Sequence, residues 1–460
     1  MRHHRVLAFL LLAALVASGC GTPATSSAPE PTQAAEPPSQ PSPTSAEPAA
    51  SEEPVTLVFW SHWATEPSKQ GVLMAAAAIL QERHPNVTVD FTWWNKVEMF
   101  PAMRNAFTAG EGFPDIFYWD RLALEFIPAG WLADLSTAID WTEVQDWARD
   151  SWTRPGPTGE PGVWAVPIET QTDEIYYNMD IFDELGVTVP DDYTFTAEEF
   201  YDICVRAREA GYDCFSNGVA DYPNMGAYLS NSTLLRQLGP TDLVSLFAGD
   251  LSWHDPDVVE AMQYVSRIID IPAYALGLST MNIAEMHTYF HTQQRAAMFM
   301  VGSWYSGRAF VPPEDGGQPA DFRLGMLRYP TQPNGRGDGY RLSGVAGAIS
   351  VAEQSPNRDL ALELAQIIAS TEIGNLWVET TAGSTGMITT TAGGPYQEYF
   401  AEFARVHEGE INVPFVSAMI SPPAYNDAYL SVVCQGLNLQ QISLEDALDR
   451  MEEARLAITD

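Results

Sequence analysis

Basic residues are scarce in this sequence. Its 23 lysines and arginines stand against 60 aspartates and glutamates, which gives a formal net charge of −37 at pH 7. The only lysines are Lys69 and Lys96, a scarcity that we interpret as codon bias or habitat rather than function. Nucleic acids and anionic lipid surfaces both bind proteins through basic surfaces. The charge balance therefore excludes both as expected partners, and it favours a soluble protein.

Cysteine is scarce as well. The chain holds four cysteines, and neither a C-x-x-C pair nor a histidine cluster accompanies them. Metal sites usually show such clusters, so the sequence predicts no metal and no other cofactor. Cys434 has no nearby cysteine and is expected to lie in the core.

Cys204 and Cys214 are close enough in sequence to form a disulfide. Residues 196–210 are expected to form a helix, which Thr196 opens with a capping-box pattern and Gly211 ends. A strand returning through Cys214 would bring its sulfur near that of Cys204. Two separate buried thiols fit the same pattern, so both alternatives stay open.

The apolar run at the N-terminus is too short to span a membrane. Arg2 and Arg5 precede Val6–Val16, which is typical of a secretion signal. The next residues, Ala17–Cys20, resemble a bacterial lipobox in which Cys20 is the lipidated first residue of the mature chain. Alanine stands where leucine is usual in that motif. A plain signal peptide cut near this point is the alternative.

The segment after this cysteine is expected not to fold. Gly21–Pro54 consists almost entirely of Pro, Ala, Ser, Thr, Glu and Gln, with no aromatic residue and no aliphatic residue larger than alanine. Such a segment cannot bury enough apolar surface to fold. The sequence therefore predicts a signal peptide over residues 1–19 and a disordered tether over 20–54. The tether would hold a folded domain near the membrane, outside the cytoplasm.

The folded part begins with alternating strands and helices. Apolar and β-branched runs predict strands at Val55–Trp60, Val87–Phe91 and Asp115–Trp119. Helical periodicity predicts Gly71–Arg83 and Val97–Ala109 between them. This order is typical of an α/β fold with a parallel sheet. Ligands bind such sheets beyond the carboxyl ends of the strands, and each of these ends carries tryptophan.

The stretch Gly162–Gly186 has the pattern of a segment that joins two lobes. It starts with a strand-like run, Val163–Ile168, and continues through a polar segment, Glu169–Glu174. A second apolar run, Ile175–Tyr177, follows. Two β-like runs separated by a polar break indicate a chain that leaves one lobe and enters another.

This stretch resembles the family 1 extracellular solute-binding proteins of ABC importers, which include the maltose- and oligosaccharide-binding proteins. A G-x-x-(Y/W)-A-x-P … Y-N-x-D-x-(F/L) segment forms the first hinge crossing in that family, and Trp164–Pro167 and Tyr177–Phe182 match it. Gly112–Arg121 and Ala296–Trp304 resemble two further family motifs, in the family's order. Gln294 stands where that last motif usually has glycine.

The resemblance implies an α/β fold of two lobes with a ligand cleft between them. The first lobe would contain residues 55–168 and 328–372, and the second would contain 169–327 and 373–460. It implies a monomeric receptor that binds a carbohydrate, closes by a hinge motion and delivers the ligand to ABC permease subunits. It implies no catalysis. The only membrane contact would be the lipid anchor.

A sugar site needs aromatic faces for the sugar ring and carboxylates, amides or arginine for its hydroxyls. Trp119, Asp120 and Arg121 offer all three at one strand end, although the last two could instead form a surface ion pair. Trp304 matches a family position that stacks on the ligand, with core packing as its alternative. The candidate contacts come from strand ends, the hinge and the C-terminal loop: Trp63, Trp94, Trp119, Asp120, Arg121, Gln171, Asp173, Trp304, Tyr425 and Asp427.

Two other functions compete with a sugar receptor. The same fold with a cationic cargo such as a polyamine would use these aromatic residues through cation–π contacts. An extracellular glycoside hydrolase would need two carboxylates about 5–10 Å apart across a bond, and no motif marks such a pair. An iron cargo would call for clustered tyrosine and histidine. The sequence favours a sugar receptor without catalytic residues.

Overall fold

The computed structural model describes residues 53–119, 124–220, 223–271, 278–415 and 421–459. The signal peptide, Cys20 and nearly all of the tether lie outside these ranges, as do Asp120 and Arg121. What the sequence indicates for those residues stays a prediction.

One mixed sheet of nine strands organises the described chain. Its order is β2-β1-β3-β10-β6-β8-β7, with β11 beside β10 and β9 beside β6. The strands are β1 (Val55–Ser61), β2 (Val87–Trp93), β3 (Ile116–Trp119), β6 (Val166–Asn178), β7 (Asp213–Phe215), β8 (Ala296–Gly302), β9 (Leu324–Leu327), β10 (Tyr340–Val351) and β11 (Ile411–Pro414). A separate small sheet pairs β4 (Thr153–Pro155) with β5 (Pro161–Val163).

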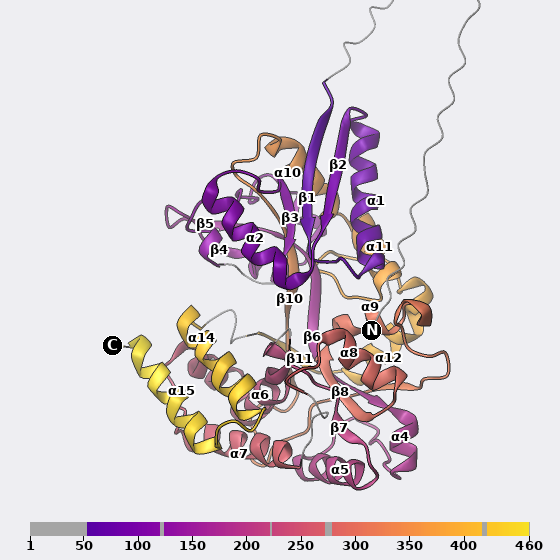
Figure 1. The fold of residues 1–460 in the computed structure, drawn as a ribbon, viewed down its shortest axis with the longest axis vertical. Coiled ribbons are helices and arrows are strands. Elements are labelled where there is room, and N and C mark those ends of the chain that lie inside the picture. Colours follow the sequence, from indigo (N-terminus) through magenta and orange to yellow (C-terminus); the bar gives the residue numbers. More distant parts are fainter. Residues whose placement is uncertain (1–52, 120–123, 221–222, 272–277, 416–420, 460) are drawn as a thin grey trace, which may run out of the picture. The chain divides into compact units, whose positions relative to one another are not determined.

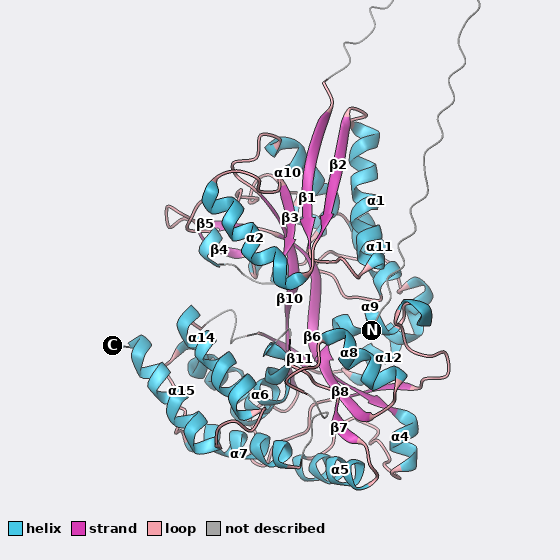
Figure 2. Cartoon of the chain, in the orientation of Figure 1, coloured by secondary structure: helices cyan, strands magenta, loops and turns pink. Residues whose placement is uncertain are grey.

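Helices cover this sheet (Figure 2). They are α1 (Pro67–Arg83), α2 (Lys96–Ala109), α3 (Asp146–Asp150), α4 (Met179–Glu184), α5 (Ala197–Glu209), α6 (Ala227–Ala248), α7 (Pro256–Asp270), α8 (Ile283–His287), α9 (Ser306–Ala309), α10 (Arg358–Ile368), α11 (Thr371–Thr381), α12 (Gln397–Val406), α14 (Pro423–Tyr429) and α15 (Leu444–Thr459). Short 3-10 or π-helical turns are η1 (Leu124–Phe126), η2 (Trp141–Glu143), η3 (Pro223–Gly226), η4 (Thr288–Thr292), η5 (Ser303–Tyr305), η6 (Pro313–Asp315), η7 (Gly394–Tyr396) and η8 (Leu430–Leu437).

The strand–helix alternation expected at the start of the folded part is confirmed. β1 pairs in parallel with both β2 and β3, and α1 and α2 make the two crossovers. Apolar side chains of α1, α10 and α11 pack on one face of these strands, and those of α2 pack on the other. We call these two clusters together the first core.

The second core forms around the C-terminal half of β6, together with β7, β8 and β9. Helices α5, α6, α7, α14 and α15 contribute apolar side chains to it. The first core also takes in Ile373, Trp377 and Met387, so the chain packs there beyond residue 372, where the sequence places the edge of the first lobe. The lobe bounds themselves stay a prediction.

Two long strands connect the cores, as Figure 1 shows for β6 and β10. β6 pairs with β10 over its first half and with β8 and β9 over its second half. The sequence indicates a polar break at Glu169–Glu174, but β6 is one continuous strand through it. The strand continues because this segment pairs with β10 and then β8, and distant cations lie against two of its carboxylates: Lys69 pairs with Glu169 and Arg341 pairs with Glu174.

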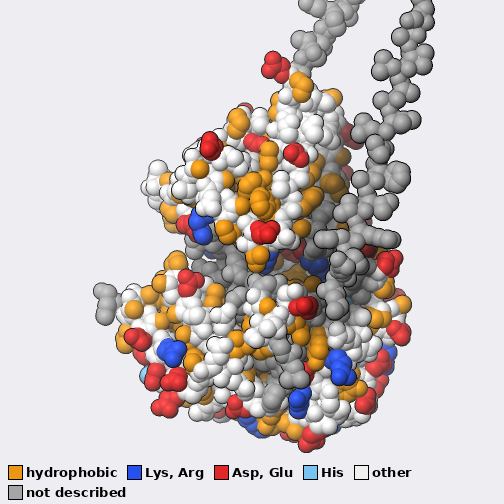
Figure 3. All heavy atoms as spheres, viewed as in Figure 1, with side chains coloured by type: hydrophobic (Ala, Val, Ile, Leu, Met, Phe, Trp, Pro, Cys, Tyr) orange, Lys and Arg blue, Asp and Glu red, His pale blue; other side chains and the backbone are white. Residues whose placement is uncertain are grey.

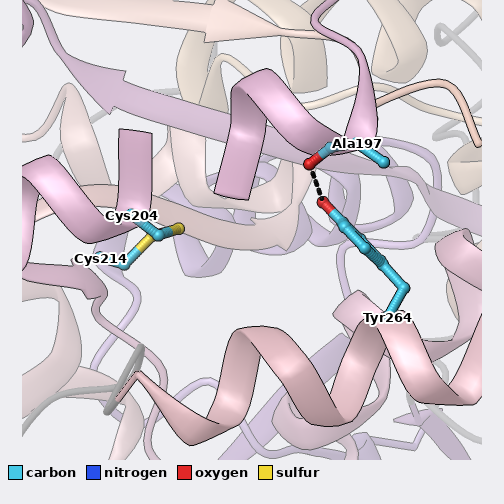
Figure 4. The surroundings of a disulfide bond; sticks show 4 residues. All are labelled: Ala197, Cys204, Cys214 and Tyr264. Atoms are coloured by element: carbon cyan, nitrogen blue, oxygen red, sulfur yellow. Dashed lines mark hydrogen bonds between the residues drawn. A yellow bond between two sulfur atoms is a disulfide. The ribbon is translucent and has the colours of Figure 1, made fainter. Parts of the chain in front are cut away.

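The expected helix around Cys204 is α5, and its capping box at Thr196 is present. A disulfide joins Cys204 in α5 to Cys214 in β7, with Cα atoms 4.9 Å apart (Figure 4). In the same region Tyr264 of α7 donates a hydrogen bond from its hydroxyl to the carbonyl of Ala197, 3.2 Å away. Cys434 is unbonded and buried. Disulfide and hydrogen bond together fix α5 on the second core.

Candidate functional site

Three of the residues singled out in the sequence gather at the end of β8. Gly302 is the register partner of Asp173 on β6. A Cβ on Gly302 would lie 2.3 Å from the indole nitrogen of Trp304 and 2.8 Å from Oε1 of Gln171. Only glycine leaves space for both side chains, so the strand end brings Gln171, Asp173 and Trp304 together. The family-like motif around Trp304 therefore lies beside the crossing strand.

These side chains differ in what they can offer a ligand. Gln171 and Trp304 are partly exposed, while Asp173 is 4 % exposed. Burial, and then the neighbouring Glu174, raises the pKa of Asp173 well above its ordinary value. Its protonated form is therefore favoured more than that of an exposed aspartate, and a protonated carboxyl can donate as well as accept a hydrogen bond.

A second aromatic group lies at the carboxyl ends of β1 and β2. The rings of Trp60 and Trp94 are 4.9 Å apart, and both residues are partly exposed. The indole nitrogen of Trp94 is buried and has no hydrogen-bond partner among the described residues. The sequence predicts Trp60 as the last residue of the first strand and does not single it out as a ligand contact. Its place at the strand's end is the signal that would have added it to the candidates.

Hydrogen bonds link the segment after Trp304 to the loop that follows β1. Arg308, in α9 just after Trp304, donates hydrogen bonds to Thr65 in the loop after β1. In that loop the amide of Ala64 donates to the carbonyl of Trp94. The surface is hollowed between the parts of the chain that hold the two cores (Figure 3).

Three other candidates have almost no surface in this structure. Trp63 is buried against Tyr118, with ring centroids 4.0 Å apart. Trp119 is buried and donates its indole N–H to the hydroxyl of Ser350 at 3.1 Å. Tyr425 is buried and accepts a hydrogen bond from the indole of Trp253 at 2.6 Å. All three fill cores in this conformation.

Asp427 lies elsewhere, exposed on α14. Asp120 and Arg121 lie outside the described residues. The structure thus gathers Gln171, Asp173 and Trp304 at the end of β8. The roles of all ten residues as ligand contacts stay predictions.

A cluster of charges that sequence reasoning did not find lies beside this group. Nζ of Lys69 is 2.8 Å from Glu66 and 2.6 Å from Glu169, and Arg308 is 3.1 Å from Glu66. We call Glu66, Lys69, Glu169 and Arg308 the bridging cluster. The rarity of lysine marked Lys69 in the sequence, but nothing in the local pattern indicates that two carboxylates surround it.

A second charge cluster lies farther along β6. Glu174 is 2.6 Å from His407, which is 2.7 Å from Glu410, and Arg236 is 2.6 Å from Glu410. Arg341 completes the set, 3.3 Å from Glu174. We call these five residues the inner cluster. All of their side chains are at most 11 % exposed, so the cluster anchors β6 rather than meeting solvent.

Two surface hollows lie away from these residues. One is lined by residues between Gly186 and Arg206, and the other by residues between Thr280 and Gln293. Neither contains a candidate residue. The described residues hold no group of three or more His, Cys, Asp or Glu side chains arranged for a metal ion. None of the helices in the described ranges combines the length and apolarity of a membrane span.

Comparison with known proteins decides the family. Residues 63–374 match the family model described as bacterial extracellular solute-binding protein. The chain belongs to this family. Its members are binding proteins rather than enzymes, and the family's extracellular placement puts this receptor outside the cytoplasm. No curated protein matches the chain by sequence.

Solved structures of this receptor type share the two-lobed fold. One was solved in work on xylan utilization by the thermophilic bacterium Caldanaerobius polysaccharolyticus, with TM-score 0.73, 20 % identity, and coverage of 86 % of this chain and 99 % of that one. A chitin oligosaccharide binding protein gives TM-score 0.73 and 19 % identity over 87 % and 98 % of the two chains. The GacH receptor of Streptomyces glaucescens, solved without ligand and with acarbose, gives 0.68 and 19 % over 88 % and 98 %. These similarities establish the fold of the receptor.

Proposed function

We propose that this receptor binds a sugar or oligosaccharide between its lobes and delivers it to the permease of an ABC importer. The first lobe would form around the first core and the second lobe around the second core. Closure about the β6 and β10 crossing would report the occupied state to the permease.

The observation that carries this proposal is the gathering of Trp304 and Gln171 at Gly302, with a second aromatic pair, Trp60 and Trp94, at the carboxyl ends of β1 and β2. Indole rings fit the apolar faces of sugar rings, and the Gln171 amide and the Asp173 carboxyl fit sugar hydroxyls. A permanent cation would instead need an ionised carboxylate, and burial together with Glu174 disfavours the ionised form of Asp173. The site therefore favours a neutral, hydroxyl-rich ligand over a polyamine.

Solved relatives support the same ligand class. Solved proteins with this fold include a chitin oligosaccharide binding protein, a receptor in complex with acarbose, one that prefers β-D-galactopyranose and one in complex with stachyose. These ligands differ from one protein to the next, so we propose a class of ligand rather than one sugar.

We further propose that Cys20 carries a lipid that anchors the receptor to the membrane by its tether. The support is the ASGC motif after a short apolar run, followed by the tether composition. A fatty-acid label should be incorporated into the wild-type chain and not into Cys20→Ser. A label that persists in Cys20→Ser would disprove this anchor.

The ligand proposal is tested with the chain from residue 20 onward carrying Cys20→Ser. Thermal unfolding and tryptophan fluorescence would be followed with xylobiose, chitobiose, maltose, galactose, stachyose, acarbose and spermidine. A saturable rise in melting temperature with a sugar, which is then recovered intact, is the expected result. A response to spermidine alone would replace the sugar with a cationic cargo, and a cleaved sugar would argue for a hydrolase.

A further inference from the structure

One side chain joins the two cores directly beside the candidate site. Arg308 belongs to α9, and both Ala309 of α9 and Tyr305 of the preceding η5 pack in the second core. Its guanidinium lies 3.1 Å from Oε1 of Glu66 and donates to the carbonyl of Thr65 at 3.1 Å. Both partners stand at the start of α1, which packs in the first core. In Figure 1, α9 lies just below the ends of α1 and α11.

The first core and the crossing strand hold an unequal set of charges next to this contact. Lys69 touches two carboxylates, Glu66 at 2.8 Å and Glu169 at 2.6 Å. Glu169 also accepts a hydrogen bond from the hydroxyl of Tyr118 at 2.5 Å. One lysine against two carboxylates leaves one negative charge uncompensated. Arg308, from the other core, supplies the missing positive charge.

The surroundings make this imbalance costly. The side chains of Lys69, Glu66 and Glu169 are 8 %, 14 % and 7 % exposed. Burial acts to raise the pKa of Glu66, but Lys69 and Arg308, with a smaller contribution from His62, hold it well below its ordinary value. Burial acts to lower the pKa of Lys69, but Glu169 and Glu66 raise it. Both groups stay charged, and buried charges are stable only when they are paired.

The bridging cluster is also continuous with the candidate site. Glu169 precedes Gln171 on β6, and Arg308 follows Trp304 in the segment from η5 to α9. His287 lies beside Trp304, with the centroids of the two rings 5.9 Å apart. Burial first, and then Arg308 and His291, lowers the pKa of His287, so it adds no positive charge at neutral pH. Arg308 is therefore the main positive charge that balances the set, beside the smaller contribution of His62.

We propose that Arg308 is a positioning residue for ligand binding, because it completes the charge balance of Glu66, Lys69 and Glu169 when the lobes close. This inference rests on the proposed receptor function. Closure brings Arg308 to Glu66 and Thr65, and opening removes it and leaves the buried excess of negative charge. Arg308 thereby stabilises the closed, ligand-bound form without being required to touch the ligand.

A fixed hinge contact is the competing explanation. Ser306 of α9 donates a hydrogen bond to the carbonyl of Ala382, which would hold α9 near the first core in both states. In that case Arg308 would contribute to folding stability alone. The two explanations differ in whether Arg308 changes the balance between open and closed forms.

The test compares wild type with Arg308→Ala, Arg308→Lys and Arg323→Ala. Arg323 is a matched control, because it pairs with Asp180 and Asp183 at the exposed surface of the second core. The affinity for the sugar of the panel that binds best is measured by calorimetry. Arg308→Ala should weaken it about tenfold. Arg308→Lys should restore most of the loss, and Arg323→Ala should leave the affinity unchanged.

A second background isolates charge balance from other effects of the substitution. In Glu66→Gln, Lys69 and Glu169 already balance each other, so adding Arg308→Ala should change the affinity less than it does in wild type. An equal effect of Arg308→Ala in both backgrounds would overturn the proposal. So would a lower melting temperature for Arg308→Ala with unchanged affinity.

Small-angle X-ray scattering of the ligand-free proteins gives a readout independent of any sugar. Arg308→Ala should have a larger radius of gyration than wild type and Arg323→Ala. Equal radii would overturn the inference even if a sugar binds. If no sugar binds wild type but the radii differ as expected, the receptor's ligand class is wrong and the role of Arg308 in closure stands.

Discussion

The two charge clusters on β6 are built from similar groups but held by different parts of the molecule. The inner cluster draws all five of its residues from segments that pack around the second core: Arg236, Glu174, Arg341, His407 and Glu410. The bridging cluster takes Glu66 and Lys69 from the first core, Glu169 from the crossing strand and Arg308 from the second core. The inner cluster therefore lies within one core, whereas the bridging cluster joins the two, so the proposed closure would change only the bridging cluster. We expect buried ion pairs within one core to stabilise the fold, and buried ion pairs between the cores to stabilise one arrangement of the lobes.

The largest effect is expected when the bridging cluster loses its lysine. Lys69→Met leaves Glu66 and Glu169 buried without the cation between them, and the free energy of unfolding should fall by about 4 kcal/mol. Lys96→Met is the control, because Lys96 is partly exposed and should change stability by about 1 kcal/mol or less. Urea unfolding measures both. Equal losses would mean that Lys69 is not the centre of a buried cluster.

A somewhat smaller loss is expected in the inner cluster. Glu410→Gln leaves Arg236, whose side chain is 3 % exposed, without its carboxylate, and stability should fall by about 3 kcal/mol. Glu408→Gln, at an exposed neighbouring position, should have little effect. Because this cluster belongs to one core, Glu410→Gln should not change the ligand-free radius of gyration. A change as large as that of Arg308→Ala would remove the distinction between the clusters.

The smallest effect is a pH dependence of opposite sign at two histidines. Burial acts to lower the pKa of His407, but Glu174 and Glu410 raise it above its ordinary value of 6.5. Its stabilising contribution is therefore complete below pH 6.5 and is lost as the pH rises through the raised pKa. Near the bridging cluster, burial lowers the pKa of His287 well below 6.5. Its contribution is present above pH 6.5 and is lost as the pH falls towards the lowered pKa.

Chemical unfolding across pH would separate the two histidines. His407→Gln should flatten the decline of unfolding free energy on the alkaline side, and His287→Gln should reduce the decline on the acid side. Loss of the alkaline decline in His287→Gln instead would contradict the assignment.

Local patterns in the sequence predict much of the fold but little of the polar interior. The parallel start of the sheet follows from apolar periodicity and from the breaks between elements, which act over a few residues. The continuity of β6 does not, because it depends on pairing with β8 and β10 and on charge partners such as Lys69 and Arg341, all far from Glu169 and Glu174 in the sequence. A polar run resembles a loop until its distant partners are known.

The residues of the candidate site show the same difference between local patterns and long-range contacts. Trp304 and Gln171 could be found from a motif, because both are fixed by the short segments that carry them. Trp63 follows β1, Trp119 ends β3 and Tyr425 lies in α14 rather than in the expected loop. Their burial depends on distant parts of the chain, including Trp377 of α11 against Trp63. No local sequence pattern marks Arg308, because its proposed role depends on a contact between the two cores.

The central claim is that sugar binds beside Trp304, between the two cores. Calorimetric titration of wild type, Trp304→Ala and Trp147→Ala with the best sugar of the panel tests it most directly. Trp147 is 43 % exposed on α3 and serves as a matched tryptophan. We expect Trp304→Ala to weaken binding by about tenfold or more, with Trp147→Ala unchanged. Equal affinity in all three proteins would place the ligand elsewhere and contradict the account.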